Sequence, residues 1–453
     1  MADKKRSVPG GAVKKKKKKP SLFRKVFWHT GSYGEYLDTL DNKGGIDIAF
    51  LMIVLVLLII GLLMMYSASY PQAIYERTAE NMRTPEFYFF KQLRAAAVGL
   101  LAMIVLTLIP YHFLQKPIVT IIAYVVCVGL LILVLVMGQT INGATRWLFG
   151  FQPSEVAKPI LVVMLAMIMS VEHKERHNPD GTLDKKTMQG AKFWSTIALP
   201  ILVMGVVAGL LFAEPHLSAC IIVGVVCLVM MFMGGADYFQ FGLLLVIVVV
   251  VGLGGMMLLS ALGYDYIGTR FNSWLNTFDP QYSDETLQIR NSLIAIGSGG
   301  WFGVGFGQSR QKYLYLPEPQ NDFIFAITVE ELGFMGGMII VLLFILLLVC
   351  GINIAGNAPD KFGMLLVTGL TTQLFLQFLM NVLVVTNGMP NTGVSLPFFS
   401  YGGTALAIQL AEVGLILNVS RYRKREQPPE EKPAEPEKAP RPREAVRVPR
   451  HRG

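Results

Sequence analysis

The chain has 453 residues, of which 53% are hydrophobic and 16% charged, and its net charge is +9. A soluble domain usually has about a quarter of its residues charged, whereas long stretches of this sequence carry almost no charge. These stretches argue against a soluble enzyme and against a nucleic-acid-binding protein. In lipid, backbone polar groups must be satisfied within helices or closed barrels, so the composition predicts a polytopic membrane protein.

Much of the positive charge lies in a run of lysines at residues 14–19, ahead of the first apolar stretch. Such a cluster attracts anionic lipid headgroups, with about 1 kcal/mol for each residue near the surface, and it keeps this end in the cytoplasm. A disordered tail that only aids solubility explains the run equally well. We expect residues 1–45 to be a basic cytoplasmic tail, with anionic membrane lipids rather than nucleic acid as its partner.

Apolar runs predict about ten membrane spans of roughly 17–25 residues, the length that crosses about 30 Å of hydrocarbon. In chain order they cover residues 46–66, 93–109, 117–137, 156–171, 193–212, 217–233, 241–262, 323–354, 362–385 and 398–419. The four cysteines lie inside these runs without the spacing of a metal site or a disulfide framework, so we expect them only to pack.

The distribution of Lys and Arg sets the orientation of the spans. With the basic tail inside, an even number of crossings returns the C-terminus to the inside, where Arg421 and Arg423 follow the last span. We therefore expect a membrane domain over residues 46–420, with a large extracytoplasmic loop at residues 263–321 between the seventh and eighth spans. Residues 421–453 are rich in Pro, Glu and Arg, which predicts a disordered cytoplasmic tail.

Asp322 is the strongest candidate for a reactive side chain. It lies where the large loop re-enters the membrane, and the apolar Phe323 and Phe325 follow it. Ionisable groups at membrane depth are functional hypotheses by default, and partial desolvation raises the pKa of a carboxyl toward the range of a general base. From local sequence alone a helix N-cap is the favoured role, since Asp ahead of an apolar helix is a usual cap. The two roles are compatible.

A second polar group precedes and opens the fourth span. Glu155 and Lys158 are three residues apart, so they share a helix face and can pair. Arg146 lies just upstream, and Arg146 with Lys158 could hold a pyrophosphate, because Arg offers paired donors. A structural ion pair with an interfacial Arg explains the same residues equally well.

Other polar or irregular segments interrupt the apolar runs. Gln373, Gln377 and Asn381 recur every four residues and form one stripe, for which hydrogen bonding to other helices is the favoured role. Residues 390–403 contain paired prolines and glycines, and a broken backbone at membrane depth is tolerated only inside protein or beside a cavity. Residues 214–216 form a short polar kink, for which a tight outer turn is favoured.

Together these residues resemble a known family. The chain is similar to the shape, elongation, division and sporulation (SEDS) proteins over its whole membrane region, because several motifs occur in the family's order. The motifs are Gly143-Ala144-Thr145-Arg146-Trp147, Gln152-Pro153-Ser154-Glu155 with Lys158, Leu316-Pro317-Glu318 with Asp322-Phe323, and Pro397 with Ser400-Tyr401-Gly402-Gly403. The resemblance implies an all-α membrane fold of ten transmembrane helices and peptidoglycan glycosyltransferase activity on lipid II, a disaccharide-pentapeptide carried by undecaprenyl pyrophosphate.

The resemblance also implies partners and a location. The usual partner is a class B penicillin-binding protein, a transpeptidase, and divalent cations such as Mg²⁺ or Mn²⁺ are implied to support activity. Tyr66-Ser67-Ala68-Ser69 in the first span is more similar to the cell-division branch than to the elongation branch, and a sporulation-specific relative stays open. We expect a multi-pass protein of the bacterial inner (plasma) membrane with both termini cytoplasmic, located at the division septum with other division proteins.

The family's functional residues are carried over position by position. Its proposed catalytic Asp falls on Asp322, and its functionally important Arg and Lys fall on Arg146 and Lys158. Further motif positions expected to bind substrate are Glu155, Lys312, Glu318 and Ser400. No residue is assigned to a metal. His216 is a departure, because the family commonly has Asp there in a Gln/Glu-Pro-Asp-Leu-Gly motif, and no acidic role is assigned to that position.

The expected mechanism is an inverting glycosyl transfer. Asp322 accepts the proton of the acceptor GlcNAc 4-hydroxyl, whose oxygen attacks the donor MurNAc anomeric carbon while Arg146 and Lys158 hold the departing pyrophosphate. Two alternatives stay open. A flippase moves lipid II between leaflets without making glycan chains and has no evident need for a carboxylate at the outer mouth. A non-catalytic division scaffold predicts that substitution of Asp322 is silent while partner binding is intact.

Overall fold

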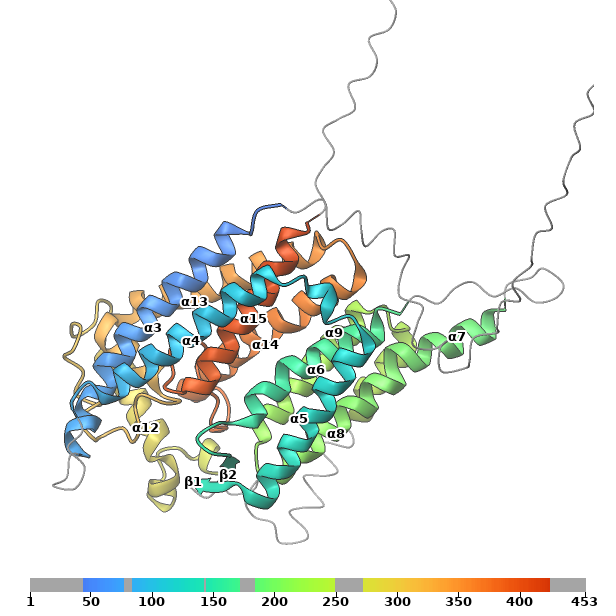
Figure 1. The fold of residues 1–453 in the computed structure, drawn as a ribbon. Helices are drawn as coiled ribbons and strands as arrows, with labels where there is room; N and C mark the ends of the chain where they lie inside the picture. The colour runs from blue at the N-terminus through green and yellow to red at the C-terminus, as the bar shows by residue number, and fades with distance from the viewer. Residues whose placement is uncertain (1–43, 77–83, 142–143, 172–183, 249–271, 424–453) are drawn as a thin grey trace, which may run out of the picture. The chain divides into compact units, whose positions relative to one another are not determined.

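The computed structural model describes residues 44–76, 84–141, 144–171, 184–248 and 272–423, and these residues are mostly helical (Figure 1). Most of both predicted tails and the start of the predicted large loop lie outside the described residues. In chain order the elements are α3 (Ile48–Tyr75), α4 (Phe87–Leu108), η1 (Tyr111–Phe113), α5 (Pro117–Met137), β1 (Gln139–Ile141), β2 (Ala144–Trp147), α6 (Pro153–Met169), α7 (Lys185–Phe193), the π-helical η2 (Trp194–Ala198), α8 (Leu199–Ala213), α9 (Leu217–Met233), a helix at Tyr238–Val248, η3 (Pro280–Tyr282), α12 (Ser283–Ser298), α13 (Ile324–Gly356), α14 (Lys361–Val385) and α15 (Gly403–Arg421).

Seven helices in the described part of the chain are long and apolar enough to cross a membrane. They are Ile48–Tyr75, Phe87–Leu108, Pro117–Met137, Thr187–Ala213, Ile324–Gly356, Lys361–Val385 and Gly403–Arg421. A polytopic, mainly helical membrane protein is therefore confirmed. Helices also lie at the other predicted spans, although the description of the seventh ends at Val248. The total of ten crossings and the position of the large loop stay predictions.

The predicted start of the last span, at residue 398, is wrong. The last helix, α15, begins at Gly403, and Phe398 has a positive φ of 67°. The left-handed region is uncommon for a bulky residue and does not continue a right-handed helix. The irregular backbone expected at residues 390–403 therefore extends to the first residue of α15, and this segment joins α14 to α15.

A small β-hairpin corrects the expectation of a purely helical fold. Strands β1 and β2 pair antiparallel, with Gln139 opposite Trp147 and Ile141 opposite Ala144. The sequence between them is Asn142-Gly143, the dipeptide most typical of two-residue hairpins. The strands are only 3 and 4 residues long, so the alternation of polar and apolar side chains is too brief to stand out. The hairpin matters because β2 carries Arg146.

Glycines allow several elements to approach one another closely. Helix α4 runs beside α15 (Figure 1), and a Cβ added at Gly414 would lie 2.6 Å from the Met103 carbonyl oxygen. Gly61 of α3 faces the backbone of Phe398, where a Cβ would collide with its carbonyl oxygen. Small residues permit such backbone contact between helices in lipid. These contacts fix the α14–α15 connection against α3.

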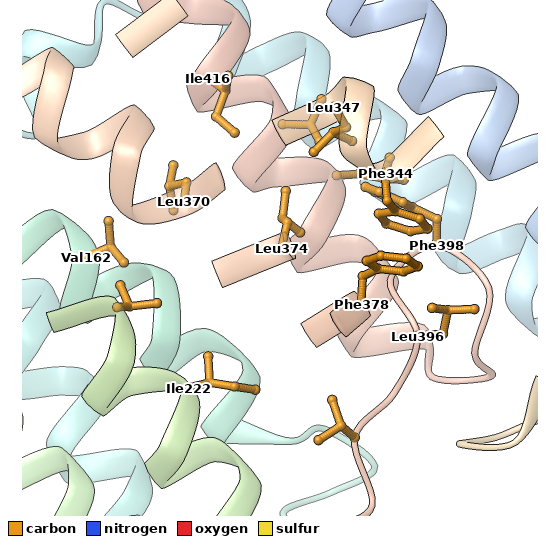
Figure 2. Close-up of a cluster of buried hydrophobic side chains, with 14 of the residues drawn as sticks. Val162, Ile222, Phe344, Leu347, Leu370, Leu374, Phe378, Leu396, Phe398 and Ile416 are labelled. Atoms are coloured by element: carbon orange, nitrogen blue, oxygen red, sulfur yellow. The ribbon is translucent and has the colours of Figure 1, made fainter. Parts of the chain in front are cut away.

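Figure 2 shows the cluster of buried apolar side chains that packs against the connection between α14 and α15. The Phe344 and Phe378 rings stack with centroids 4.1 Å apart and planes 9° apart, and Phe398 lies beyond Phe344 at 6.4 Å. All three rings are at most 3% exposed. Aromatic pairs of this kind add about 0.5–1.5 kcal/mol beyond the burial of their area. The cluster therefore ties α13 and α14 to the segment that precedes α15.

Helix α13 is two helices joined at Gly333, which has φ 76° and ψ 179°. The backbone of residues 299–305 lies against this break, where Phe334 N–H donates to the Gly300 carbonyl at 2.8 Å and Val304 N–H to the Glu330 carbonyl at 3.0 Å. A side chain at Gly303 would collide with the Glu331 carbonyl oxygen. The loop ahead of α13 is thus fixed to the same helix that it leads into, which restricts the position of Asp322.

Candidate active site

Asp322 lies just ahead of α13 and does not cap it. The helix begins at Ile324 with Phe323 as its N-cap residue, and no side chain makes a capping hydrogen bond there. The favoured N-cap role for Asp322 is therefore wrong. None of the described residues donates a hydrogen bond to its carboxylate, which lies against Gly393, where an added Cβ would be 3.4 Å from Oδ2. The side chain is half-buried.

The charge around Asp322 favours a proton-accepting role. Burial raises the pKa of its carboxyl to about 6; the negative charges of Glu318 and Glu155 also raise it, and the positive charge of Arg146 lowers it. A general base works best when its pKa lies near the working pH. The structure therefore brings Asp322 and Glu318, which share one motif, within electrostatic reach of Arg146 and Glu155 from two other motifs.

Arg146 projects from β2 toward the turn between α8 and α9. Its Nε donates to the Glu214 carbonyl at 3.4 Å, and its Nη2 donates to the Pro215 carbonyl. Both acceptors are neutral, so these bonds orient the guanidinium without neutralising its charge. The segment at residues 214–216 is thus the tight turn that was favoured, and it also positions a cation of the candidate site.

Glu155 and Lys158 form a buried ion pair at the start of α6. The Lys158 Nζ lies 2.9 Å from both Glu155 carboxylate oxygens, and the two side chains are 4% and 8% exposed. His216 connects this pair with Arg146, because burial, Arg146 and Lys158, in that order, all lower the pKa of its imidazole. Arg146 and Lys158 therefore both act electrostatically on the His216 side chain, and a pyrophosphate site shared by these two cations stays a prediction.

Two buried acids at the site were given no functional role from the sequence, although Glu214 lies in the polar kink noted there. Glu214 is fully buried, neither carboxyl oxygen has a hydrogen-bond partner among the described residues, and burial raises its pKa to about 7. Glu412 of α15 is 2% exposed, accepts a hydrogen bond from Gln373 Nε2 at 2.6 Å, and interacts electrostatically with Lys158. An acid inside an apolar span is a functional hypothesis by default, so Glu412 could have been found.

Two of the three residues of the stripe on α14 make the interhelical hydrogen bonds expected of them, and Asn381 bonds to loop carbonyls instead. Gln373 bonds to Glu412, and Gln377 accepts from Gln409 Nε2 at 3.2 Å. Gln409 in turn accepts from the Phe398 N–H at 3.1 Å. The stripe therefore joins α14 to α15 and to the connection between them.

Glu318 and Ser400 border Asp322 through backbone and side-chain contacts. Glu318 Oε2 accepts from Asn321 Nδ2 at 2.7 Å. The Ser400 hydroxyl accepts from the Leu396 N–H at 2.7 Å and donates to the Asn321 carbonyl at 2.8 Å. Ser400 thus holds the loop before α13 against the loop before α15. Substrate contacts by Glu318 and Ser400 stay predictions.

Lys312 makes its contacts away from this group. Its Nζ donates to Glu331 Oε1 at 2.8 Å and to the Ser67 hydroxyl at 2.9 Å, and the ion pair is almost fully buried. Glu331 of α13 thus holds the loop that carries Lys312, and Ser67 connects the same ion pair to α3. The sequence interpretation did not identify Glu331. Substrate binding by Lys312 stays a prediction.

The described residues do not form a metal site by themselves. No three side chains of His, Cys, Asp or Glu come together in the described part of the chain. The carboxylates near Asp322 already have partners, since Glu155 pairs with Lys158 and Glu318 with Asn321. We therefore assign no residue to a metal.

Comparisons with known proteins place the chain in a family. The sequence model of the FtsW/RodA/SpoVE family, described as cell cycle protein, matches residues 48–425. The stage V sporulation protein E of Bacillus subtilis (strain 168) is 38% identical over 389 residues, covering 84% of this chain and 98% of that protein. The probable peptidoglycan glycosyltransferase FtsW of Geobacter sp. (strain M18) is 34% identical over 380 residues, covering 83% and 97%.

Solved structures agree with this placement. RodA, the rod shape determining protein of Thermus thermophilus, superposes with a TM-score of 0.58 at 27% identity, covering 84% of this chain and 98% of that one. A chain from a peptidoglycan synthase complex that coordinates polymerization and crosslinking superposes with a TM-score of 0.63 at 26% identity, covering 84% and 99%. The SEDS resemblance of the motifs is therefore confirmed, and the chain belongs to the FtsW/RodA/SpoVE family of cell cycle proteins.

Proposed function

We propose that this protein is a peptidoglycan glycosyltransferase that polymerises lipid II into glycan strands during bacterial cell division. Two lines support the activity: relatives that align over nearly their full length are named probable peptidoglycan glycosyltransferases, and a similar fold occurs in a peptidoglycan synthase complex. The observation that carries the proposal is the Asp322 carboxyl just ahead of α13, which lies against Gly393, has a raised pKa and is within electrostatic reach of Arg146.

In the proposed reaction, Asp322 accepts the proton of the acceptor GlcNAc 4-hydroxyl as that oxygen forms a bond to the donor MurNAc anomeric carbon. The bond from that carbon to undecaprenyl pyrophosphate breaks, the electron pair leaves with the pyrophosphate, and the configuration inverts. A positioned general base contributes typically about 10²–10⁴-fold. The ionised carboxylate is the reactive form, and its raised pKa makes it a stronger base than an ordinary Asp.

Arg146 and Lys158 are proposed to bind the departing pyrophosphate. The guanidinium is already oriented by two neutral carbonyls, and charge-assisted bonds from Arg to phosphate are about twice as strong as neutral ones. Lys158 is paired with Glu155, so its ammonium would be shared between that carboxylate and the phosphate. A divalent cation such as Mg²⁺ or Mn²⁺ stays a prediction, and no step above passes through it.

The partner, the location and the branch are proposals on the same basis. A class B penicillin-binding protein is the proposed partner, since the structural neighbour belongs to a complex that couples polymerization with crosslinking. We propose that the protein works with other division proteins at the septum, with both termini cytoplasmic. Relatives include both FtsW proteins and a sporulation protein, so a septum formed during sporulation is the alternative location.

The test is a glycan-chain assay on purified protein with its cognate transpeptidase and lipid II. Wild type is compared with Asp322→Ala and with Asp279→Ala, which removes an exposed acid ahead of α12. We expect Asp322→Ala to lose at least about 100-fold in rate and Asp279→Ala to retain wild-type rate. Full activity of Asp322→Ala rejects the proposed base. Wild-type protein that moves lipid II between leaflets without making chains would support a flippase instead.

A further inference from the structure

Asn381, the outermost residue of the α14 stripe, differs from Gln373 and Gln377 in what it holds. Its Nδ2 donates to the Asp322 carbonyl at 2.6 Å and to the Val394 carbonyl at 2.7 Å. The side chain is fully buried, and its Oδ1 has no hydrogen-bond partner among the described residues. The donor half of this amide therefore joins two loops, whereas its acceptor half makes no protein contact that the structure describes.

The two carbonyls belong to the two backbone segments that meet where the Asp322 carboxylate lies against Gly393. One is the backbone carbonyl of Asp322 itself, and the other belongs to the residue after Gly393, against which Oδ2 lies. Gly393 has a φ of +67°, a conformation that L side chains rarely adopt. The single side chain of Asn381, on α14, thus holds the backbone of Asp322 and the backbone next to Gly393.

We propose that Asn381 is the positioning residue for the general base: its amide clamps the Asp322 and Val394 backbones so that the carboxylate is held against Gly393. The inference rests on the proposed function of Asp322. Displacements of about 1 Å in a reacting group cost as much as 10²-fold in rate. A loss of the clamp leaves two buried carbonyls unpaired, so the loops before α13 and α15 shift apart and water reaches the carboxylate.

The clamp predicts a particular kinetic pattern in Asn381→Leu and in the isosteric Asn381→Asp, which places an oxygen opposite the two carbonyls. We expect kcat to fall roughly 10- to 100-fold, while the KM for lipid II changes by less than about twofold, because Arg146 and Lys158 are not part of the clamp. The charged groups that act on Asp322 are Glu318, Arg146 and Glu155. In Asn381→Leu, hydration of the Asp322 carboxylate should lower the pH midpoint of the acid limb by about half a unit or more, whereas Asn381→Asp adds a like charge that raises the pKa of Asp322, so this second variant tests kcat alone.

The matched control is Thr371→Val, on the same helix. Thr371 is 2% exposed and its hydroxyl has no hydrogen-bond partner among the described residues, so this variant should retain wild-type kcat and pH midpoint. Size-exclusion profile and Tm are recorded for all variants.

Three outcomes overturn the clamp: folded Asn381 variants with wild-type kcat, a lower kcat with an unmoved pH midpoint in Asn381→Leu, or variants that do not fold, which would make the residue purely structural. Full activity of Asp322→Ala rejects the base itself, whereas an inactive Asp322→Ala beside normal Asn381 variants rejects only the clamp.

Discussion

Two carboxylates at the start of α13, Asp322 and Glu331, are only nine residues apart and have opposite surroundings. Glu331 accepts hydrogen bonds from the Ser67 hydroxyl, the Gly307 and Ser309 N–H groups and the Lys312 ammonium. Asp322 accepts none from the described residues, and burial raises its pKa. A saturated carboxylate holds structure together, whereas an unsatisfied one is able to take a proton. Two acidic residues in the same part of the fold thus have different roles: Glu331 stabilises the structure, and Asp322 is the proposed proton acceptor.

The largest expected effect tests the structural member of this pair. Glu331→Ala leaves Lys312 as an uncompensated buried charge, and breaking a buried pair in this way costs about 3–5 kcal/mol. We expect a marked fall in the Tm of the purified protein in detergent. Double substitution with Lys312→Met should recover part of the loss, because it removes the unpaired charge. A Tm equal to that of wild type would show that Glu331 is not structural.

A smaller effect is expected at the pyrophosphate end. Arg146→Gln removes a charged donor, and hydrogen bonds to charged groups contribute about 1.5–3 kcal/mol, which corresponds to roughly 10- to 100-fold in kcat/KM for lipid II. Arg146→Lys keeps the charge but loses the paired geometry, so it should recover only part of the activity. The pH at which the rate is half-maximal should not fall in either variant. Arg146→Gln removes a positive charge that lowers the pKa of Asp322, and Arg146→Lys keeps that charge. Wild-type kcat/KM in Arg146→Gln contradicts the assignment.

The smallest effect concerns pH. Because the pKa of the Asp322 carboxyl is raised to about 6, the active ionised form is lost as the pH falls through 6. We expect the rate to be half-maximal near pH 6 and to fall about tenfold for each further unit. An ordinary Asp would stay ionised to about pH 4. A rate that is constant between pH 7 and pH 5 would contradict a desolvated base, provided that the Tm is unchanged over that range.

How much of the fold was predictable depends on the range of the interactions involved. The bounds of α5 and α9 follow directly from their apolar runs, because a helix that crosses lipid needs an uninterrupted stretch of apolar residues. The break at Gly333 escaped prediction, since its cause is the backbone of residues 299–305, which a local pattern does not reveal. The start of α15 was misplaced for a similar reason, because Phe398 is apolar but its backbone is left-handed.

The candidate site shows the same division. Asp322, Arg146 and Lys158 were identified in separate motifs, and the structure shows Arg146 acting electrostatically on Asp322 and, together with Lys158, on His216. Glu412 lies in an apolar run near polar Gln409, and its partner Gln373 is on another helix. Lys312 and Glu331 are joined by Ser67 from α3, a contact across more than half of the chain. The sequence thus identifies ionisable residues that could react. Contacts between residues far apart in the sequence decide which of these side chains already have hydrogen-bond or ion-pair partners.

The most direct measurement compares Asp322→Asn with Glu331→Gln in one experiment that records both the rate of glycan-chain synthesis and the Tm. Asp322→Asn should abolish most of the rate and leave the Tm unchanged or higher, because a carboxyl with a raised folded-state pKa destabilises the fold when it is ionised. Glu331→Gln should lower the Tm, with activity lost only in proportion to unfolded protein. An Asp322→Asn protein that makes chains at the wild-type rate would contradict the account.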